Sequence, residues 1–128
     1  MSRWVRVLFG DTLLPPQQKT ELFSLVSQAS GQPIAATSPA DRGGFSLGIG
    51  QTWPPSLEGP LWFYQGETYG YQAAWFRRAG DDLVVVMGIN SHPADDKRLF
   101  LYQTVLDILE PGSLVNPEAA PPLTKLPN

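Results

Sequence analysis

The side chains that could do chemistry are few, and their spacing completes no catalytic motif. No Ser is followed three residues later by Lys, the spacing that places a hydroxyl one helical turn from an amine base. Neither G-x-S-x-G nor H-E-x-x-H occurs. The only histidine, His92, precedes a proline and is interpreted as an exposed loop residue rather than a catalytic one. With one His and no Cys, a zinc site would need mostly carboxylates, so we predict no catalytic residue, no metal site and no cofactor.

The acidic and aromatic groupings have structural explanations. Asp81-Asp82 suits a turn and Asp95-Asp96 a helix start, so neither is predicted to be a pair of catalytic acids. The aromatic residues between positions 62 and 76 could form a stacking surface. Because alternate positions of a strand point to opposite faces, at least half of them must belong to a core.

One short stretch, Tyr64-Gln65-Gly66-Glu67, keeps a candidate binding role. It lies at the end of a predicted strand, and a glycine there lets another backbone or a ligand approach closely. A free main-chain N–H on such an edge could donate a hydrogen bond to an oxyanion. From these residues alone a tight hairpin is the default, and a substrate-binding edge is the alternative.

Composition limits the class of protein. The 128 residues make at most one domain with a real core, and 13 Pro and 12 Gly predict much loop. A net charge of −3, with no basic cluster beyond Arg77-Arg78 and Lys97-Arg98, argues against a nucleic-acid partner. No apolar run approaches the roughly 18–20 residues of a membrane span, and Met1–Gly10 lacks the features of a signal peptide. As written, the chain is expected to be soluble, and cytoplasmic unless exported.

The candidate stretch lies in the most strand-like part of the chain, residues 61–90. Short turn signals, Gly66 to Thr68 and Ala79 to Asp82, divide this part into a three-stranded antiparallel meander. The last strand contains three consecutive valines, which predicts burial on both faces, the deepest of the three, and a central place in the sheet. The meander supplies that strand with a neighbour on one edge only. The predicted strands are Leu61–Tyr64, Tyr69–Arg77 and Leu83–Ile89.

Two helices are predicted before the meander. Ser2–Phe9 is amphipathic, and Pro15-Pro16 suits the first turn of a second helix that ends at Ser30-Gly31. The buried face predicted for the second helix consists of Leu22, Leu25, Val26 and Ala29. Gln32–Gly44 is typical of an irregular crossing loop, and Phe45–Trp53 of an extended segment with close backbone approach at its glycines.

One helix is predicted after the meander. Lys97–Leu109 has little polar face, so we expect it to pack flat against a sheet. Pro111-Gly112 ends it, and residues 111–128 are predicted to form a Pro-rich extended or disordered tail beyond a domain of residues 1–110. The predicted class is therefore α+β, an antiparallel meander with N-terminal helices and a C-terminal helix packed on the sheet.

The order of five short segments resembles the C-terminal part of the serine β-lactamase-related hydrolases. That family includes class C β-lactamases, D-alanyl-D-alanine carboxypeptidases and related esterases. The likeness covers residues 2 to 110 and includes the strings RWVRVLFG, FSLGIG, YQGETYGY and LVVVMGINS. The matching segments are Ser2–Gly10, Leu13–Ser30, Phe45–Gly50, Tyr64–Tyr71 and Leu83–Ser91.

The resemblance implies a fold and a mechanism. The family fold is a five-stranded antiparallel sheet with helices on both faces and an all-helical second region, and its fifth strand pairs with a strand from the N-terminal part. The family acylates the Ser of S-x-x-K with help from a Tyr in Y-x-N. A K-T-G or H-x-G triplet binds the substrate carboxylate, and the N–H just after it completes the oxyanion hole.

This chain matches only the last of those motifs. No S-x-x-K or Y-x-N occurs, whereas the triplet aligns with Tyr64-Gln65-Gly66 and the oxyanion N–H with Glu67. The resemblance thus implies that Tyr64, Gln65, Gly66 and Glu67 bind substrate. Because Tyr64 replaces the family's cation, carboxylate binding is expected to be weaker, with Gln65 still able to hydrogen-bond.

Two hypotheses follow from the sequence. The first is a truncated C-terminal segment of a periplasmic hydrolase acting on D-Ala-D-Ala peptides, β-lactams or esters, inactive alone and completed by an N-terminal part. The abrupt helical start at Ser2 favours it. The second is a stand-alone, non-catalytic α/β module that binds a partner through an exposed strand edge. An enzyme that uses Tyr64 or Ser91 by itself has no base within sequence reach.

Overall fold

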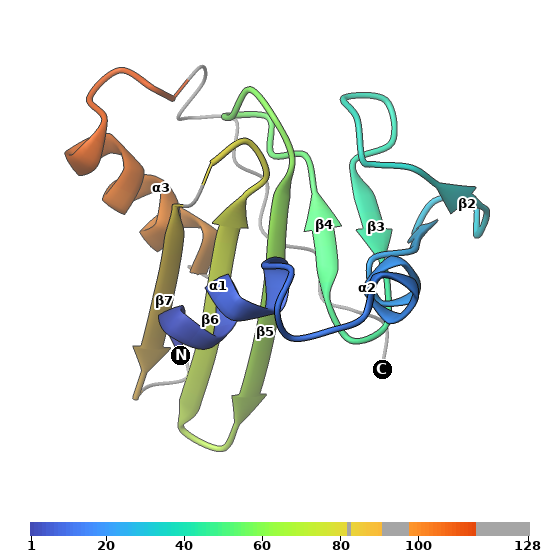
Figure 1. The fold of residues 1–128 in the computed structure, drawn as a ribbon. Coiled ribbons are helices and arrows are strands. Elements are labelled where there is room, and N and C mark those ends of the chain that lie inside the picture. Colours follow the sequence, from blue (N-terminus) through green and yellow to red (C-terminus); the bar gives the residue numbers. More distant parts are fainter. Residues whose placement is uncertain (82, 91–97, 115–128) are drawn as a thin grey trace.

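An antiparallel sheet of seven strands, in the order β2-β1-β3-β4-β5-β6-β7, organises the part of the chain that the structure describes (Figure 1). The structure is a computed structural model, and it describes residues 1–81, 83–90 and 98–114. The strands are β1 (Leu25–Ser27), β2 (Pro33–Ile34), β3 (Gly43–Phe45), β4 (Gly50–Thr52), β5 (Leu61–Thr68), β6 (Tyr71–Arg78) and β7 (Val84–Ile89).

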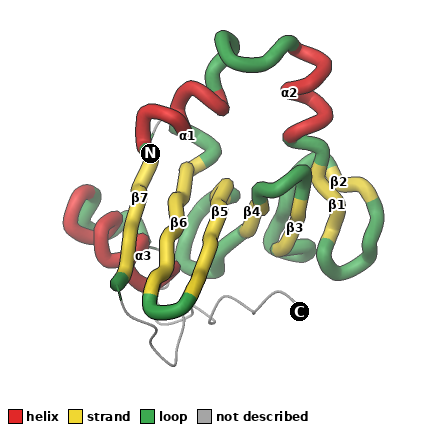
Figure 2. Tube along the Cα trace, turned by 90° about the horizontal axis from the view of Figure 1, so that it is seen from below, coloured by secondary structure: helices red, strands yellow, loops and turns green. Residues whose placement is uncertain are grey.

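Helices lie on both faces of this sheet. Figure 2 shows α1 and α2 on one face, called here the α1 face, and α3 on the opposite face, called the α3 face. The helices in the described residues are α1 (Ser2–Phe9), α2 (Pro16–Leu22) and α3 (Arg98–Leu109). The predicted α+β class, with helices before the meander and a helix on the sheet after it, is confirmed. Of these helices, none is long and apolar enough to cross a membrane.

The β5–β6 hairpin supplies both cores of the fold. Its strands pair along their whole length, from Leu61 opposite Arg78 to Thr68 opposite Tyr71. Since side chains alternate across a strand, successive residues go to opposite faces. On the α3 face, Leu61, Ala74 and Phe76 pack with Leu57, Leu99, Tyr102 and Leu106. On the α1 face, Trp75 packs with Val5 and Ile49, and Phe9, Phe23, Trp62 and Val84 surround them.

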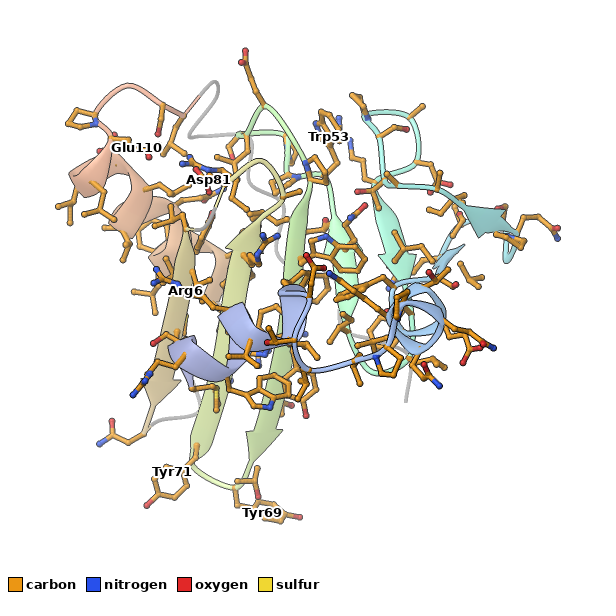
Figure 3. All side chains as sticks on the ribbon, in the orientation of Figure 1. Arg6, Trp53, Tyr69, Tyr71, Asp81 and Glu110 are labelled. Atoms are coloured by element: carbon orange, nitrogen blue, oxygen red, sulfur yellow. The ribbon has the colours of Figure 1, made fainter. Side chains whose placement is uncertain are left out.

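Two polar contacts hold α3 on its face of the sheet. The Arg78 guanidinium at the end of β6 donates to both carboxylate oxygens of Glu110, each at 2.8 Å, and also to Asp81. These hydrogen bonds lower the pKa of Glu110 and of Asp81 and raise the pKa of Arg78. Figure 3 shows Asp81 and Glu110 close together at the same end of the sheet. At the buried side of the helix, the Gln103 amide donates to the Ser56 hydroxyl.

The helix predicted to run to Ser30-Gly31 ends much earlier. The structure ends α2 at Leu22, and Leu25–Ser27 forms strand β1 instead. In β1, Leu25 and Val26 pair with β2, and Val26 and Ser27 pair with β3. A short apolar spacing of this kind suits a helix face or a strand, and long-range pairing decides between them.

The prediction of an irregular loop over Gln32–Gly44 is also partly wrong. Pro33–Ile34 forms β2, and Gly43 and Gly44 begin β3. The predicted extended segment Phe45–Trp53 is divided between the end of β3 and all of β4, which pair with each other. Between them Gly48 adopts a φ of 88°, a left-handed conformation that glycine accepts without strain. Strands of two or three residues carry too little local pattern to be recognised without their partners.

The meander is confirmed as three antiparallel neighbours, with two corrections. The first turn lies at Tyr69-Gly70 rather than at Gly66 to Thr68, and Gly70 supplies the required φ of 78°. The deepest strand is β6, in which Ala74, Trp75 and Phe76 are at most 2% exposed, whereas Val86 in β7 is 37% exposed. In the described sheet β7 is a terminal strand with β6 as its partner.

Several predictions concern residues that the structure does not describe. His92, Ser91, Asp82 and Asp95-Asp96 lie outside the described residues, as do Lys97 at the predicted helix start and residues 115–128 of the predicted tail. The rest of the predicted C-terminal helix is confirmed as α3, and Leu114 beyond it packs against the core of the α3 face.

A glycine substitution tests the sheet packing. A Cβ on Gly50 would lie 2.6 Å from two ring carbons of Phe63, which stands opposite on β5. Gly50→Ala must therefore displace that ring, and we expect it to lower the free energy of unfolding by about 1–3 kcal/mol. Gly88→Ala is the matched control, because a Cβ there meets nothing within 4 Å. Urea denaturation measures both variants, and equal stability of the two would contradict the packing.

Candidate functional site

Half of strand β5 has an open edge within the described sheet. On one side β5 pairs with β6 along its whole length, but on the other side β4 pairs only with Leu61, Trp62 and Phe63. In Figure 1, β5 continues well past the end of β4. Among the described residues, Tyr64 to Thr68 therefore have a strand partner only in β6. All four predicted site residues lie on this segment, called here the open edge.

The ladder geometry shows which main-chain groups face outward. The Ala79 N–H donates to the Pro60 carbonyl at 3.1 Å, which makes this opposite pair a hydrogen-bonded one. Hydrogen-bonded and non-hydrogen-bonded pairs alternate along an antiparallel ladder. The main-chain groups of Tyr64 and Gly66 must then point toward β6, and those of Gln65 and Glu67 away from it. The Glu67 N–H thus faces the open edge, where the predicted oxyanion donor should be.

On the α1 face, a tyrosine ring covers the glycine of the triplet. A Cβ on Gly66 would lie 3.5 Å from the Tyr64 hydroxyl oxygen and 3.6 Å from a ring carbon of Tyr64. The ring therefore lies along the strand with its hydroxyl beside Gly66. Tyr64 is 48% exposed, so its ring also forms part of the surface next to the open edge.

On the α3 face, the side chains of Gln65 and Glu67 have different environments. The side-chain oxygen of Gln65 is buried and has no hydrogen-bond partner among the described residues. The Glu67 side chain is 52% exposed, and its carboxylate lies 3.6 Å from the guanidinium of Arg98 at the start of α3. Arg98 is 4% exposed, so it brings a buried positive charge beneath this end of the sheet. Gln72, which stands opposite Glu67, is equally buried.

The aromatic cluster on the α1 face positions the strand but stops short of the open edge. Phe9 of α1 contacts Trp75 edge-on at 6.0 Å and Trp62 at 5.7 Å between ring centroids. Phe23, just after α2, also contacts Trp62. The guanidinium of Arg77 lies 4.4 Å from the centre of the Phe9 ring, a cation–π contact. Beyond this cluster the surface carries exposed tyrosines, with Tyr69 and Tyr71 at the hairpin end in Figure 3.

The arrangement presents main-chain groups to an extended ligand, and its described residues include no nucleophile paired with a base. Outward N–H and C=O groups at Gln65 and Glu67 can pair with a peptide-like backbone, as an added strand does. The Glu67 N–H can also donate to a developing oxyanion. Within residues 1–81, 83–90 and 98–114, no group of three acidic or histidine side chains is placed to hold a metal ion. The open edge therefore offers main-chain donors and acceptors to an extended ligand.

No protein-family model matches the chain, and no curated protein or solved structure matches it either.

Sequence reasoning placed the four candidate residues together but missed that they alternate between the two faces of one continuous strand. The predicted turn at Gly66 to Thr68 would have ended the strand where the structure continues it. The contact between Glu67 and Arg98 was also missed, because no local signal links a strand residue to a helix so far along the chain. The position of Gly70 was an available signal, since a glycine favours the φ of 78° found there.

Hydrogen exchange tests the open edge. We expect the main-chain amides of Gln65 and Glu67 to exchange at least about tenfold faster than those of Tyr64 and Gly66, which point to β6. Residue-resolved exchange by NMR measures this alternation, and Phe63 is the internal control because it faces β4. Equal protection at Glu67 and Gly66 would contradict an open edge.

Proposed function

We propose that this chain is the substrate-edge part of a serine β-lactamase-related hydrolase, a C-terminal segment that is inactive alone. In this proposal β5 carries the substrate triplet in the altered form Tyr64-Gln65-Gly66. The Glu67 N–H acts in the oxyanion hole, and the nucleophilic serine belongs to another part of the enzyme. The parent enzyme would be periplasmic and would act on D-Ala-D-Ala peptides, β-lactams or esters through an acyl-serine.

The observation that carries the proposal is the outward direction of the Glu67 N–H on an unpaired edge. The triplet was assigned from its place in the sequence, and a hairpin at Gly66 would have left no such edge. The pairing of β5 with β6 past Gly66 instead extends the strand to Thr68. A main-chain N–H can donate to an oxyanion when no other acceptor takes it, and among the described residues the Glu67 N–H faces no strand partner.

The outer edge of β7 also supports the proposal, because it leaves the described sheet open to a further strand. The Arg78 N–H donates to the Leu83 carbonyl at 3.2 Å, so this opposite pair of β6 and β7 is a hydrogen-bonded one. By alternation, the main-chain groups of Val84, Val86 and Gly88 point away from β6. The outer edge of β7 can therefore receive a further strand, as the family's fifth strand does.

Two measurements test the proposal. The reading frame upstream of Met1 should encode S-x-x-K followed by Y-x-N, and an in-frame stop codon close to Met1 would contradict this. The 128-residue chain itself should not be acylated by a fluorescent penicillin, because it lacks the serine–lysine pair. Covalent labelling of one of its serines, located by mass spectrometry, would refute the proposal that the nucleophilic serine belongs to another part of the enzyme.

The outer edge of β7 also favours a second candidate function, a stand-alone module that binds a partner strand. Residues Val84–Ile89 carry no charge, and uncharged exposed edges readily accept another strand. This candidate predicts a single cooperative thermal transition for the chain alone. The hydrolase proposal predicts a broad transition or a loosely packed state, because a strand edge and part of a sheet face lack their covers. Calorimetry of the 128-residue chain distinguishes the two.

A further inference from the structure

We infer that the open edge of β5 takes an uncharged ligand, an ester or amide without a free carboxylate, extended along Gln65 and Glu67. This inference rests on the proposed function and selects among its substrate classes. The feature that selects among these substrates is the distribution of charge around the open edge. The triplet Tyr64-Gln65-Gly66 alone does not determine that distribution.

The main chain of the edge binds neutral groups. Gln65 and Glu67 each present an N–H and a C=O, and these pair with the amide or ester groups of an extended ligand. The N–H favours a carboxylate, to which its hydrogen bond is charge-assisted, whereas the C=O repels one, so the two main-chain groups oppose each other in this choice. Discrimination must come from the side chains that flank the edge on its two faces.

The flanking side chain on the α1 face is aromatic and neutral. The Tyr64 ring lies over Gly66 and is 48% exposed, so it offers an apolar surface with one hydroxyl. A neutral hydroxyl can donate a hydrogen bond to a carboxylate, but it brings no positive charge to neutralise the ligand as a Lys or Arg would. An apolar acyl or alkyl group gains contact area against the ring.

The flanking charge on the α3 face is negative. The Glu67 carboxylate is 52% exposed and belongs to the residue whose N–H faces the ligand. Its neighbour Arg98 has a side chain only 5% exposed and lies 3.6 Å from it, beneath the sheet. A ligand carboxylate at this edge would meet the negative charge of Glu67 before the buried guanidinium.

Arg77, on the neighbouring strand β6, has a different contact. Arg77 stands opposite Trp62, and its guanidinium lies 4.4 Å from the centre of the Phe9 ring within the aromatic cluster. Moving it to a ligand would give up that cation–π contact. Among the described residues, the charges beside the edge therefore disfavour an anionic ligand.

A matched pair of ligands tests this inference on the full 128-residue chain. The probes are N-acetyl-D-alanyl-D-alanine and its C-terminal amide, which differ by one charge. NMR titration follows the main-chain amide resonances of Gln65 and Glu67. We expect the amide probe to shift them, with the carboxylate probe binding at least about fivefold more weakly.

Two variants change the charge beside the open edge without changing its main-chain groups. Tyr64→Lys adds a cation on the α1 face and should reverse the preference to the carboxylate probe. Glu67→Gln removes the negative charge and should reduce the difference between the probes. Tyr64→Phe is the control, because it keeps the ring and removes only the hydroxyl. It should keep the preference for the amide. Tyr64 and Glu67 are about half exposed, so these variants should fold, which the core amide resonances check.

The outcomes separate this inference from the proposed function. If the unmodified chain binds the carboxylate probe as tightly as the amide, the edge is a site but the inference is overturned. The inference is also overturned if only Tyr64→Lys binds a probe, and that probe is the carboxylate. If neither probe moves Gln65 or Glu67 in the unmodified chain or in Tyr64→Lys, the substrate edge itself is refuted, and the inference with it.

Discussion

The pairing of β5 with β6 is the interaction on which the rest of the structure depends. It runs from Leu61 opposite Arg78 to Thr68 opposite Tyr71, the longest strand pairing in the described sheet. Because side chains alternate, one hairpin places Trp75 in one core and Phe76 in the other. The helices on both faces then have apolar surfaces to cover. The ion pair from Arg78 to Glu110, the residue after α3, holds the end of that helix to the same hairpin.

The same alternation determines what the candidate site can be. Four consecutive residues cannot all turn their side chains to one ligand on a strand. Tyr64 and Gly66 lie on the α1 face, whereas Gln65 and Glu67 lie on the α3 face. What Gln65 and Glu67 share is the main-chain edge, which the end of β4 leaves unpaired. The site is therefore a backbone site, and side chains modify it through shape and charge.

Two of the sheet edges with unpaired main-chain groups among the described residues, the open edge of β5 and the outer edge of β7, differ in chemistry. The open edge of β5 is flanked by a tyrosine ring and a carboxylate. The outer edge of β7 carries only apolar residues and a glycine, which suits a permanent partner strand.

The sequence by itself determined the elements with a strong local pattern. The amphipathic α1, the β-rich runs of the meander and the apolar α3 all follow from residues close together in the chain. Tertiary structure decided the rest, because strands such as β2 (Pro33–Ile34) exist only through their partners. It also decided that β5 continues past Gly66, since pairing with β6 outweighed the local turn signal. The open edge, the outward Glu67 N–H and the contact with Arg98 all depend on that pairing, and no local pattern in the sequence encodes it.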